Sequence, residues 1–315
     1  MEKNTEEARE GKTNDDSRRR WTMKKTSRLK QLVLDKEILV MPGAFDALSA
    51  KIVEQAGFKC TTLGGYPTSA VRLAKPDVSL LTLTEMVEHT RYICDAVDIP
   101  VLIDGDTGHG NVTNVIRTVK QFEQAGAAGL FIEDQVFPKR CGHMEGKQVI
   151  PTEEMIVKLR AAVDARRDQD FIIMARTDAL AVYGIDEAIE RGNRYREAGA
   201  DLIFIEAPPS VEEMRRINRE VKAPTSANMV EGGKTPILTA KELEEIGYAV
   251  ATFPLSTLYA AAWAVRWVMG ELSKSGTTKG CFERMTLFNE FNGLVGLQGV
   301  RDVESHYYRD LLRKA

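Results

Sequence analysis

From residue 28 onward, the chain repeats one pattern: a short apolar run, a polar or glycine-containing turn, and an amphipathic stretch of ten or more residues. The apolar runs have the length and the aliphatic character of buried strands, and they lie at residues 38–41, 60–63, 101–104, 129–133, 171–176, 202–206, 225–228 and 249–253. Eight predicted strands that alternate with helices favour an α/β fold, a (β/α)8 TIM barrel. A doubly wound dinucleotide-binding sheet is disfavoured, because no Gly-x-Gly-x-x-Gly motif follows the first predicted strand.

The amphipathic stretches predict the helices of this barrel. Residues 112–125, 152–166 and 186–198 carry apolar side chains three and four positions apart. Glycine commonly ends a helix, because it adopts the left-handed backbone conformation without strain. The predicted helix ends carry Gly57, Gly126, Gly199 and Gly247.

The two ends of the chain depart from the repeat. Residues 1–27 are rich in charge and poor in aliphatic side chains, which predicts a disordered polar tail. The remaining residues, 28–315, are expected to form one barrel domain. Because the residues after 255 exceed the length of one final barrel helix, we expect extra C-terminal helices that pack on a partner subunit.

Composition narrows the class of protein. The chain has 315 residues, of which 43% are hydrophobic, so it can bury a large core. A net charge of -3 gives no general attraction to nucleic acid or to an anionic membrane. No apolar run approaches the roughly 20 residues that cross a bilayer, and the first residues lack the apolar part of a signal peptide. We therefore expect a cytoplasmic protein with no nucleic-acid or membrane partner and, because its four cysteines are far apart, with reduced thiols.

Polar side chains follow the predicted strands at the point where each strand ends. They are Asp104, Asp106, Glu133, Asp134, Arg176, Asp178, Glu206 and Asn228. Catalytic groups of a TIM barrel collect at the carboxyl ends of its strands. Side chains two positions apart on a strand point to the same side, so Asp104 and Asp106 are expected to face one ion together. A hard divalent cation such as Mg²⁺ prefers these oxygen ligands.

Arg176 is suited to a bidentate grip on a substrate carboxylate or on a developing oxyanion. The structural alternative is a salt bridge with Asp178 or Glu206.

A thiol among cationic groups follows the fourth predicted strand. Residues 139–143 read Lys-Arg-Cys-Gly-His, which is too polar for a core segment. A cysteine thiol is mostly protonated at neutral pH, and neighbouring cationic groups stabilise the thiolate that remains once it has given up its proton. Cys141 is therefore the predicted general acid, assisted by Lys139, Arg140 and His143. A nucleophilic cysteine is the alternative, but the sequence offers no dedicated base for it.

Five segments also stand out as motifs. They read Asp-Gly-Asp-Thr-Gly at 104–108, Ile-Glu-Asp-Gln at 132–135, Pro-Lys-Arg-Cys-Gly-His at 138–143, Met-Ala-Arg-Thr-Asp at 174–178 and Ala-Asn-Met-Val-Glu-Gly-Gly-Lys-Thr-Pro at 227–236. Together they resemble the isocitrate lyase and phosphoenolpyruvate mutase superfamily, over about residues 32 to 307. The Lys-Arg-Cys-Gly-His loop is similar to that of its carbon-carbon lyase branch, which includes 2,3-dimethylmalate and 2-methylisocitrate lyases.

The resemblance implies a bound Mg²⁺, or alternatively Mn²⁺, and a homotetramer in which the last helix is exchanged between neighbouring subunits. It implies that the ion is surrounded, directly or through water, by Asp104, Asp106, Glu133 and Glu206, with Asp77 nearby. It further implies that the carboxylate of a 2-oxo acid binds the backbone N–H groups of Gly64, Gly65 and Tyr66, although most members have Ser or Thr in place of Gly64. The distal part of the substrate is expected to meet Asn228, Glu231, Gly233 and Pro236.

The residues and the resemblance together predict a Mg²⁺-dependent carbon-carbon lyase that cleaves a small 2-hydroxy acid of the alkylmalate type. Examples are 2,3-dimethylmalate and 2-methylisocitrate, and the products are a 2-oxo acid such as pyruvate and a carboxylic acid. The alternatives are an oxaloacetate hydrolase or decarboxylase, a carboxyphosphonoenolpyruvate phosphonomutase, and a role without catalysis. Tyr259 stands where the resemblance places an arginine that holds the extra carboxylate of isocitrate and 2-methylisocitrate, so a smaller or more apolar substrate is expected.

Overall fold

The computed structural model describes residues 23–142 and 144–312. Eight strands alternate with helices in this part of the chain, as the hydrophobic pattern predicts, and each strand boundary lies within one residue of the expected position. The strands are β1 (Leu39–Pro42), β2 (Thr61–Leu63), β3 (Val101–Asp104), β4 (Gly129–Glu133), β5 (Ile172–Thr177), β6 (Leu202–Ile205), β7 (Ser226–Asn228) and β8 (Val250–Phe253).

All neighbouring strands are parallel and close into a barrel. Strands β2 to β6 pair in sequence order, and β1 pairs with β8, which pairs with β7. Two parallel bridges join these groups, Gly43 with Thr62 and Ile203 with Thr225. The predicted (β/α)8 architecture is therefore confirmed.

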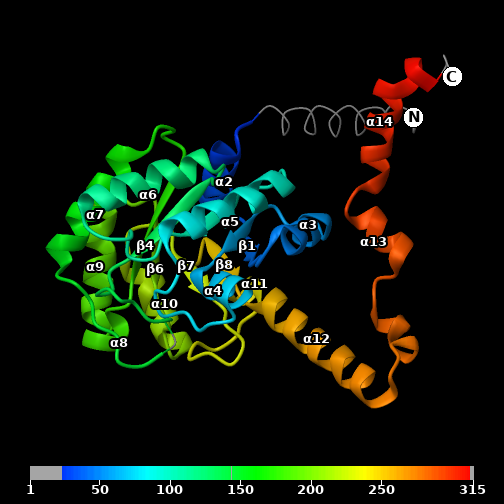
Figure 1. The fold of residues 1–315 in the computed structure, drawn as a ribbon. Helices are drawn as coiled ribbons and strands as arrows, with labels where there is room; N and C mark the ends of the chain where they lie inside the picture. Colours follow the sequence, from blue (N-terminus) through cyan, green and yellow to red (C-terminus); the bar gives the residue numbers. More distant parts are fainter. Residues whose placement is uncertain (1–22, 143, 313–315) are drawn as a thin grey trace, which may run out of the picture. The chain divides into compact units, whose positions relative to one another are not determined.

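Helices surround the strands (Figure 1). Those of the barrel are α2 (Lys25–Leu34), α3 (Ala47–Gln55), α4 (Gly65–Leu73), α5 (Leu83–Ala96), α6 (Val112–Gln124), α7 (Thr152–Ala165), α8 (Leu180–Tyr183), α9 (Ile185–Glu197), α10 (Val211–Glu220) and α11 (Ala240–Ile246). Capping boxes begin α5 at Thr82, α6 at Asn111 and α11 at Thr239. The four glycines expected at helix ends all have φ between 89° and 110°, where other residues are strained.

Two apolar layers hold the barrel together. Outward-facing strand residues such as Ile103 and Ile132 pack against helical residues such as Phe122. Inside the barrel, Leu102 and Met174 belong to a second cluster. The same cluster includes Leu29 and Val33 of α2, so this helix closes the amino end of the barrel, opposite the ends at which the polar groups collect.

The amino-terminal boundary corrects one expectation. The predicted tail of residues 1–27 lies mostly outside the described residues, but its last three residues are the first turn of α2. Polar contacts anchor this turn: Lys25 Nζ donates to the carbonyl oxygens of Cys94 and Val97, at 2.9 and 2.6 Å, and Thr26 Oγ1 donates to Asp168. Side-chain partners far along the chain therefore order a segment that lacks aliphatic residues.

The chain divides into two compact units rather than the single expected domain, with the boundary between Thr257 and Leu258. The second unit consists of α12 (Ser256–Ser275), which begins in the first unit, η1 (Lys279–Arg284), α13 (Phe288–Leu294) and α14 (Leu297–Leu312). Within it, Trp263 and Trp267 stack with a ring separation of 6.2 Å. Large apolar side chains of this unit are exposed, including Trp263, Phe288 and Tyr307. No helix of the described chain has both the length and the apolar character that a bilayer crossing requires.

Candidate active site

A cavity lies at the carboxyl ends of the barrel strands. It has an apolar floor and a polar rim, because side chains two positions apart on one strand both point inward: Leu102 and Asp104 on β3, for example, or Met174 and Arg176 on β5. Eight of the predicted site residues line this one cavity. They are Gly64, Tyr66, Asp77, Asp104, Cys141, Arg176, Glu206 and Asn228.

Asp104 and Asp106 meet, but for a different reason from the one expected. Strand β3 ends at Asp104, and Asp106 lies beyond it in the left-handed conformation with φ 48°. The N–H of Asp106 donates to Oδ1 of Asp104 at 2.8 Å. Gly105 permits this turn, since a Cβ there would lie 2.7 Å from the carbonyl oxygen of Phe131. A tight turn, rather than strand alternation, brings the two carboxylates together.

Lys139 reaches these carboxylates from the loop after β4. Its Nζ lies 2.8 Å from Oδ1 of Asp106 and 2.8 Å from Oδ2 of Asp77, and its side chain is buried. Burial would lower the pKa of Lys139, but Asp106, Asp104 and Glu133 outweigh burial and hold this pKa well above its ordinary value. Lys139 is therefore a fixed positive charge beside the cavity.

The pKa values of Asp104 and Asp106 are shifted in opposite directions. Burial raises the pKa of Asp104 to about 6, since Lys139 offsets only part of the desolvation and the charges of Asp106 and Asp77 add to it. Burial also acts on Asp106, but Lys139 and His109 oppose it and lower the pKa of Asp106 below its ordinary value. Asp106 is therefore the carboxylate that stays charged over the wider pH range.

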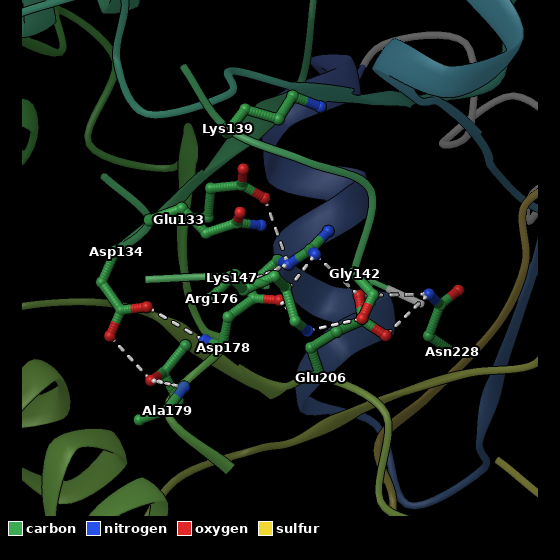
Figure 2. Close-up of polar contacts among 12 residues, drawn as sticks. Glu133, Asp134, Lys139, Gly142, Lys147, Arg176, Asp178, Ala179, Glu206 and Asn228 are labelled. Carbon is green, nitrogen blue, oxygen red and sulfur yellow. Dashed lines mark hydrogen bonds and ion pairs between the residues drawn. The ribbon is translucent and has the colours of Figure 1, made fainter. Parts of the chain in front are cut away.

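Arg176 is at the centre of the buried charges (Figure 2). Its Nε and Nη2 donate to the two oxygens of Asp178 at 2.9 and 3.2 Å, and Nη2 lies 3.1 Å from Oε2 of Glu206. Burial would lower the pKa of Arg176, but Asp178, Glu133 and Glu206 raise it well above its ordinary value. Both salt bridges named as the structural alternative for Arg176 are present, and the guanidinium also lines the cavity.

Glu133 has the least satisfied carboxylate at this end of the barrel. It is fully buried, and its Oε2 lies 3.2 Å from Nε of Arg176, yet neither carboxylate oxygen accepts a hydrogen bond. Burial raises the pKa of Glu133 well above its ordinary value, although Arg176 and Lys139 favour the charged form. A buried carboxylate that accepts no hydrogen bond is costly unless a further cation or a water molecule joins it.

These groups fit a hydrated magnesium ion. No three carboxylate, imidazole or thiol groups in the described ranges converge into a ready-made metal cage. Mg²⁺ does not need such a cage, because it keeps several waters and binds one or two carboxylates directly. The carboxylate oxygens of Glu133, which accept no hydrogen bond, and the all-oxygen donor set suit such an ion, with part of the contacts made through water.

The loop after β4 brings Cys141 to the cavity. Cys141 and Gly142 both line it, and Cys141 is half-buried. Gly142 packs directly against the buried charges: a Cβ there would lie 2.4 Å from Nη2 of Arg176 and 2.5 Å from Cγ of Glu206. A side chain at position 142 would therefore push the loop, and the adjacent thiol, away from the site.

Lys139 and Arg140, the two cationic residues before Cys141, differ in burial. Arg140 is exposed and absent from the cavity lining, and its Nη1 donates to the carbonyl oxygen of Glu145 at 3.2 Å. The side chain of Lys139 is buried and that of Arg140 is exposed, and the role expected for Arg140 beside the thiol stays a prediction. His143 lies outside the described residues.

One of the backbone N–H groups expected to bind a substrate carboxylate at the start of α4 already donates to Asp104. Gly64 and Tyr66 line the cavity, but the N–H of Gly65 donates to Oδ2 of Asp104 at 2.8 Å. This N–H orients Asp104 in the structure, whereas the family resemblance implies that it binds the substrate. Gly65 has little space for a side chain, since a Cβ there would lie 3.2 Å from the same carboxylate oxygen.

The segment after β7 contributes less than expected. Asn228 lines the cavity and lies 3.3 Å from Oε1 of Glu206. A turn closed by the N–H of Gly233 and the carbonyl oxygen of Val230 directs the following residues away, so Glu231, Gly233 and Pro236 do not line the cavity. The exposed Glu231 instead accepts a hydrogen bond from Ser256. Val230, which is not among the predicted site residues, lines the cavity.

Lys147 and the apolar floor of the cavity are not among the predicted site residues. The floor includes Phe131, Met174 and Phe204, each two positions before a predicted polar site residue, so strand alternation could have identified them. No comparable signal identifies Lys147. The three cysteines not selected for catalysis, Cys60, Cys94 and Cys281, are buried, and none of the four cysteines, all within the described chain, forms a disulfide.

Comparison with characterised proteins gives the same superfamily as the motifs. The family model for phosphoenolpyruvate phosphomutase matches residues 29–272. The chain is 48% identical to 2,3-dimethylmalate lyase of Eubacterium barkeri over 90% of this chain and 99% of that protein. It is 45% identical to petal death protein of Dianthus caryophyllus, over 91% of this chain and 90% of that protein. It is 45% identical to 2-methylisocitrate lyase of Aeropyrum pernix, over 85% of this chain and 86% of that protein.

Solved structures agree in fold. Oxaloacetate acetylhydrolase in complex with 3,3-difluorooxalacetate has a TM-score of 0.85 and 34% identity, over 90% of this chain and 97% of that one. A phosphonopyruvate hydrolase complex with oxalate and Mg²⁺ has a TM-score of 0.83 and 32% identity, over 90% of this chain and 99% of that one. The chain belongs to the PEP mutase/isocitrate lyase superfamily of enzymes.

Proposed function

We propose that this enzyme is a Mg²⁺-dependent carbon-carbon lyase that cleaves a 2-hydroxy acid of the alkylmalate type into a 2-oxo acid and a carboxylic acid. The observation that carries the proposal is that Cys141 lines the same cavity as Asp104, Arg176 and Glu206. A proton donor, an oxyanion-binding guanidinium and metal-binding carboxylates are the three groups that this cleavage requires.

The chain's own groups have distinct roles in the proposed reaction. When the bond between C2 and C3 breaks, the hydroxyl proton passes to solvent and the electron pair of the bond moves onto C3 of the departing acid. Cys141 gives its thiol proton to C3 of that fragment, and the resulting thiolate takes up a proton from solvent before the next cycle, so that protons balance. Arg176 stabilises the negative charge that develops on the substrate oxygens.

Asp104, Asp106, Glu133 and Glu206 would hold the metal directly or through water, with Asp77 linked to them through Lys139. A bound Mg²⁺ would act as a Lewis acid toward the substrate's hydroxyl and carboxylate oxygens, and Mn²⁺ could replace it. The buried carboxylate of Glu133, which accepts no hydrogen bond, supports this assignment.

An alkyl-substituted substrate is favoured over a tricarboxylate. The cavity floor formed by Phe131, Met174 and Phe204 is apolar, and a third carboxylate buried there would lack a partner. Tyr259 in place of an arginine agrees with this preference. The relative named 2,3-dimethylmalate lyase acts, by its name, on a substrate of this class.

Hydrolysis of oxaloacetate is the second candidate. The structural likeness to oxaloacetate acetylhydrolase favours it, because the same carboxylates and arginine suit a 2-oxo dicarboxylate. We further propose a homotetramer with exchanged C-terminal helices, which would cover the exposed apolar side chains of the second unit. A cytoplasmic location stays a prediction.

Product analysis tests the reaction. We would incubate the purified enzyme and Mg²⁺ separately with 2,3-dimethylmalate, 2-methylisocitrate and oxaloacetate, and repeat each reaction with excess EDTA. The proposal expects EDTA-sensitive pyruvate release that is fastest with 2,3-dimethylmalate. If the fastest reaction is instead the release of oxalate and acetate from oxaloacetate, the hydrolase is favoured. If ³¹P NMR shows a new carbon-phosphorus bond after incubation with carboxyphosphonoenolpyruvate, the mutase is favoured.

A further inference from the structure

A buried lysine lies on the returning half of the loop that carries Cys141. Residues 135–150 leave the barrel and return to it, and the two halves are joined at their base by a bridge between Gln135 and Val149. The N–H of Ile150 donates to the carbonyl oxygen of Asp134 at 2.8 Å, so the base is fixed to the end of β4. Lys147 lies just above this base with its side chain 2% exposed.

Lys147 joins the loop to the barrel. Its Nζ donates to the carbonyl oxygen of Gly142, the residue after Cys141, and to Oδ1 of Asp178 at 2.7 Å. A buried ammonium is strongly unfavourable without such partners. Because one partner is backbone of the loop and the other is a barrel side chain, the ammonium holds the two together.

Asp178 also holds Arg176. Both of its oxygens accept from the guanidinium, at 2.9 and 3.2 Å, and its own N–H donates to Oδ1 of Asp134 at 3.0 Å. Asp134 is in turn fixed by Tyr195 and Arg191 of α9 through its Oδ2. One rigidly held carboxylate therefore sets the position of Arg176 and of Lys147 at once (Figure 2).

The position of Gly142 shows what this connection does. Its backbone packs so closely on Arg176 and Glu206 that a Cβ would overlap both. Close packing alone gives no direction to the loop, whereas the Lys147 hydrogen bond fixes the carbonyl group of Gly142, the residue directly after Cys141. We infer that Lys147 is a positioning residue that holds Cys141 at the correct place relative to Arg176, through Gly142 and Asp178. This inference rests on the proposed function of Cys141 as proton donor.

The test removes the ammonium and keeps the length of the side chain. We expect Lys147→Met to lower kcat by about 10²-fold, since misplacing a reacting group by about 1 Å has an effect of that size, while KM changes by less than about threefold. In the same variant the rate of Cys141 alkylation by iodoacetamide, followed by mass spectrometry of the Cys141 peptide, rises at least about tenfold, because the thiol is less restrained.

A matched control separates positioning from general stability. Lys25 also donates to two backbone carbonyl oxygens, but at the closed end of the barrel, so Lys25→Met loses the same kind of contact far from the loop. We expect it to lower thermal stability and to leave kcat and the Cys141 alkylation rate unchanged. Ethylammonium added to Lys147→Ala is expected to restore kcat by about tenfold or more, since the amine can occupy the vacated charged site.

The outcomes separate this inference from the proposed function. The inference is overturned if Lys147→Met changes neither kcat nor the rate of Cys141 alkylation. It is also overturned if ethylammonium does not restore kcat in Lys147→Ala and Lys25→Met shows the same loss of kcat. If the wild type lacks lyase activity but Lys147→Met still accelerates alkylation of Cys141, the proposed function fails and the positioning role stands. If Lys147→Met does not fold, Asp178→Asn, which keeps its shape, is expected to show the same faster alkylation, and unchanged alkylation there contradicts the inference.

Discussion

Glu133 and Arg176 occupy the same register position on the adjacent parallel strands β4 and β5, and their side chains meet at 3.2 Å. Because Arg176 also pairs with Asp178 and Glu206, one guanidinium compensates three carboxylates that are almost fully buried. Arg176 therefore stabilises the fold and lines the cavity at once, so its substitution should affect both.

Replacing Arg176 with lysine tests this double role. A lysine keeps the charge but loses the planar fork that spans several carboxylates, so we expect Arg176→Lys to lower kcat/KM by about 10²-fold or more. Its unfolding free energy should fall by about 2–4 kcal/mol, since buried carboxylates lose a partner. Steady-state assays and urea unfolding give the two values. Arg194→Lys, which alters a more exposed pair with Glu153, should change neither, and near wild-type activity in Arg176→Lys would contradict the assigned role.

The stability of the metal-free protein should depend on Asp104. The pKa of Asp104 is about 6 in the folded protein, whereas its ordinary value of 3.8 applies to the unfolded chain. Between these two pH values, Asp104 therefore binds more protons in the native protein than in the unfolded chain. Asp104 therefore makes the protein less stable as pH rises from about 4 to 6. We expect Asp104→Asn in EDTA to be more stable than the wild type at pH 7 by about 1–3 kcal/mol and equal to it at pH 4.

Urea unfolding at pH 4, 5.5 and 7 measures this dependence. Asp164→Asn, at an exposed position of α7, is the control and should follow the wild type at every pH. A destabilised Asp104→Asn protein at pH 7, or a difference that does not vary with pH, would show that burial does not dominate the energetics of this carboxylate.

Substrate preference should respond to residue 259. Tyr259 stands where the family resemblance places an arginine that holds a third substrate carboxylate. Under the proposed function, we therefore expect Tyr259→Arg to shift the ratio of kcat/KM values for 2-methylisocitrate and 2,3-dimethylmalate toward the tricarboxylate by about tenfold. Tyr259→Phe is the control and should leave the ratio close to that of the wild type. The assignment of this position fails if both variants shift the ratio equally.

Assembly should depend on the exposed apolar side chains of the second unit. Phe288 is 81% exposed and Trp263 is 60% exposed, which is unusual for residues of this size unless a partner covers them. We expect Trp263→Asp and Phe288→Asp to convert a tetramer into smaller species in light scattering after size-exclusion chromatography. Tyr92→Asp on α5, at a position 61% exposed, should leave the assembly unchanged. A monomeric wild type would contradict the proposed tetramer.

The fold was predictable from the sequence because its strands are short, apolar and separated by clear helix signals. Val101–Asp104 and Gly129–Glu133 agree with the predicted boundaries to the residue. The boundary of the tail was wrong because Lys25 and Thr26 are ordered by side-chain contacts to residues far along the chain. Such contacts leave no trace in local composition.

The site was predictable where strand ends determine direction and less so in loops. Glu133, Arg176 and Glu206 converge because the ends of parallel strands share one rim. The orientations of Arg140 and Glu231 depend on local turns, and the pattern of residue types does not reveal which side of a loop a side chain faces. Lys147 was not predicted for the same reason, since a lysine is expected on the surface unless it pairs with a buried carboxylate.

The proton donor is the central claim, and replacing its thiol tests it most directly. We would measure kcat for 2,3-dimethylmalate cleavage by wild-type enzyme, Cys141→Ala and the control Cys94→Ala, together with the affinity of each for oxalate in the presence of Mg²⁺. The account predicts that Cys141→Ala loses about 10³-fold or more in kcat while its oxalate affinity stays within about threefold of the wild type, and that Cys94→Ala retains full activity. A Cys141→Ala enzyme that turns over at a rate near that of the wild type would contradict the account.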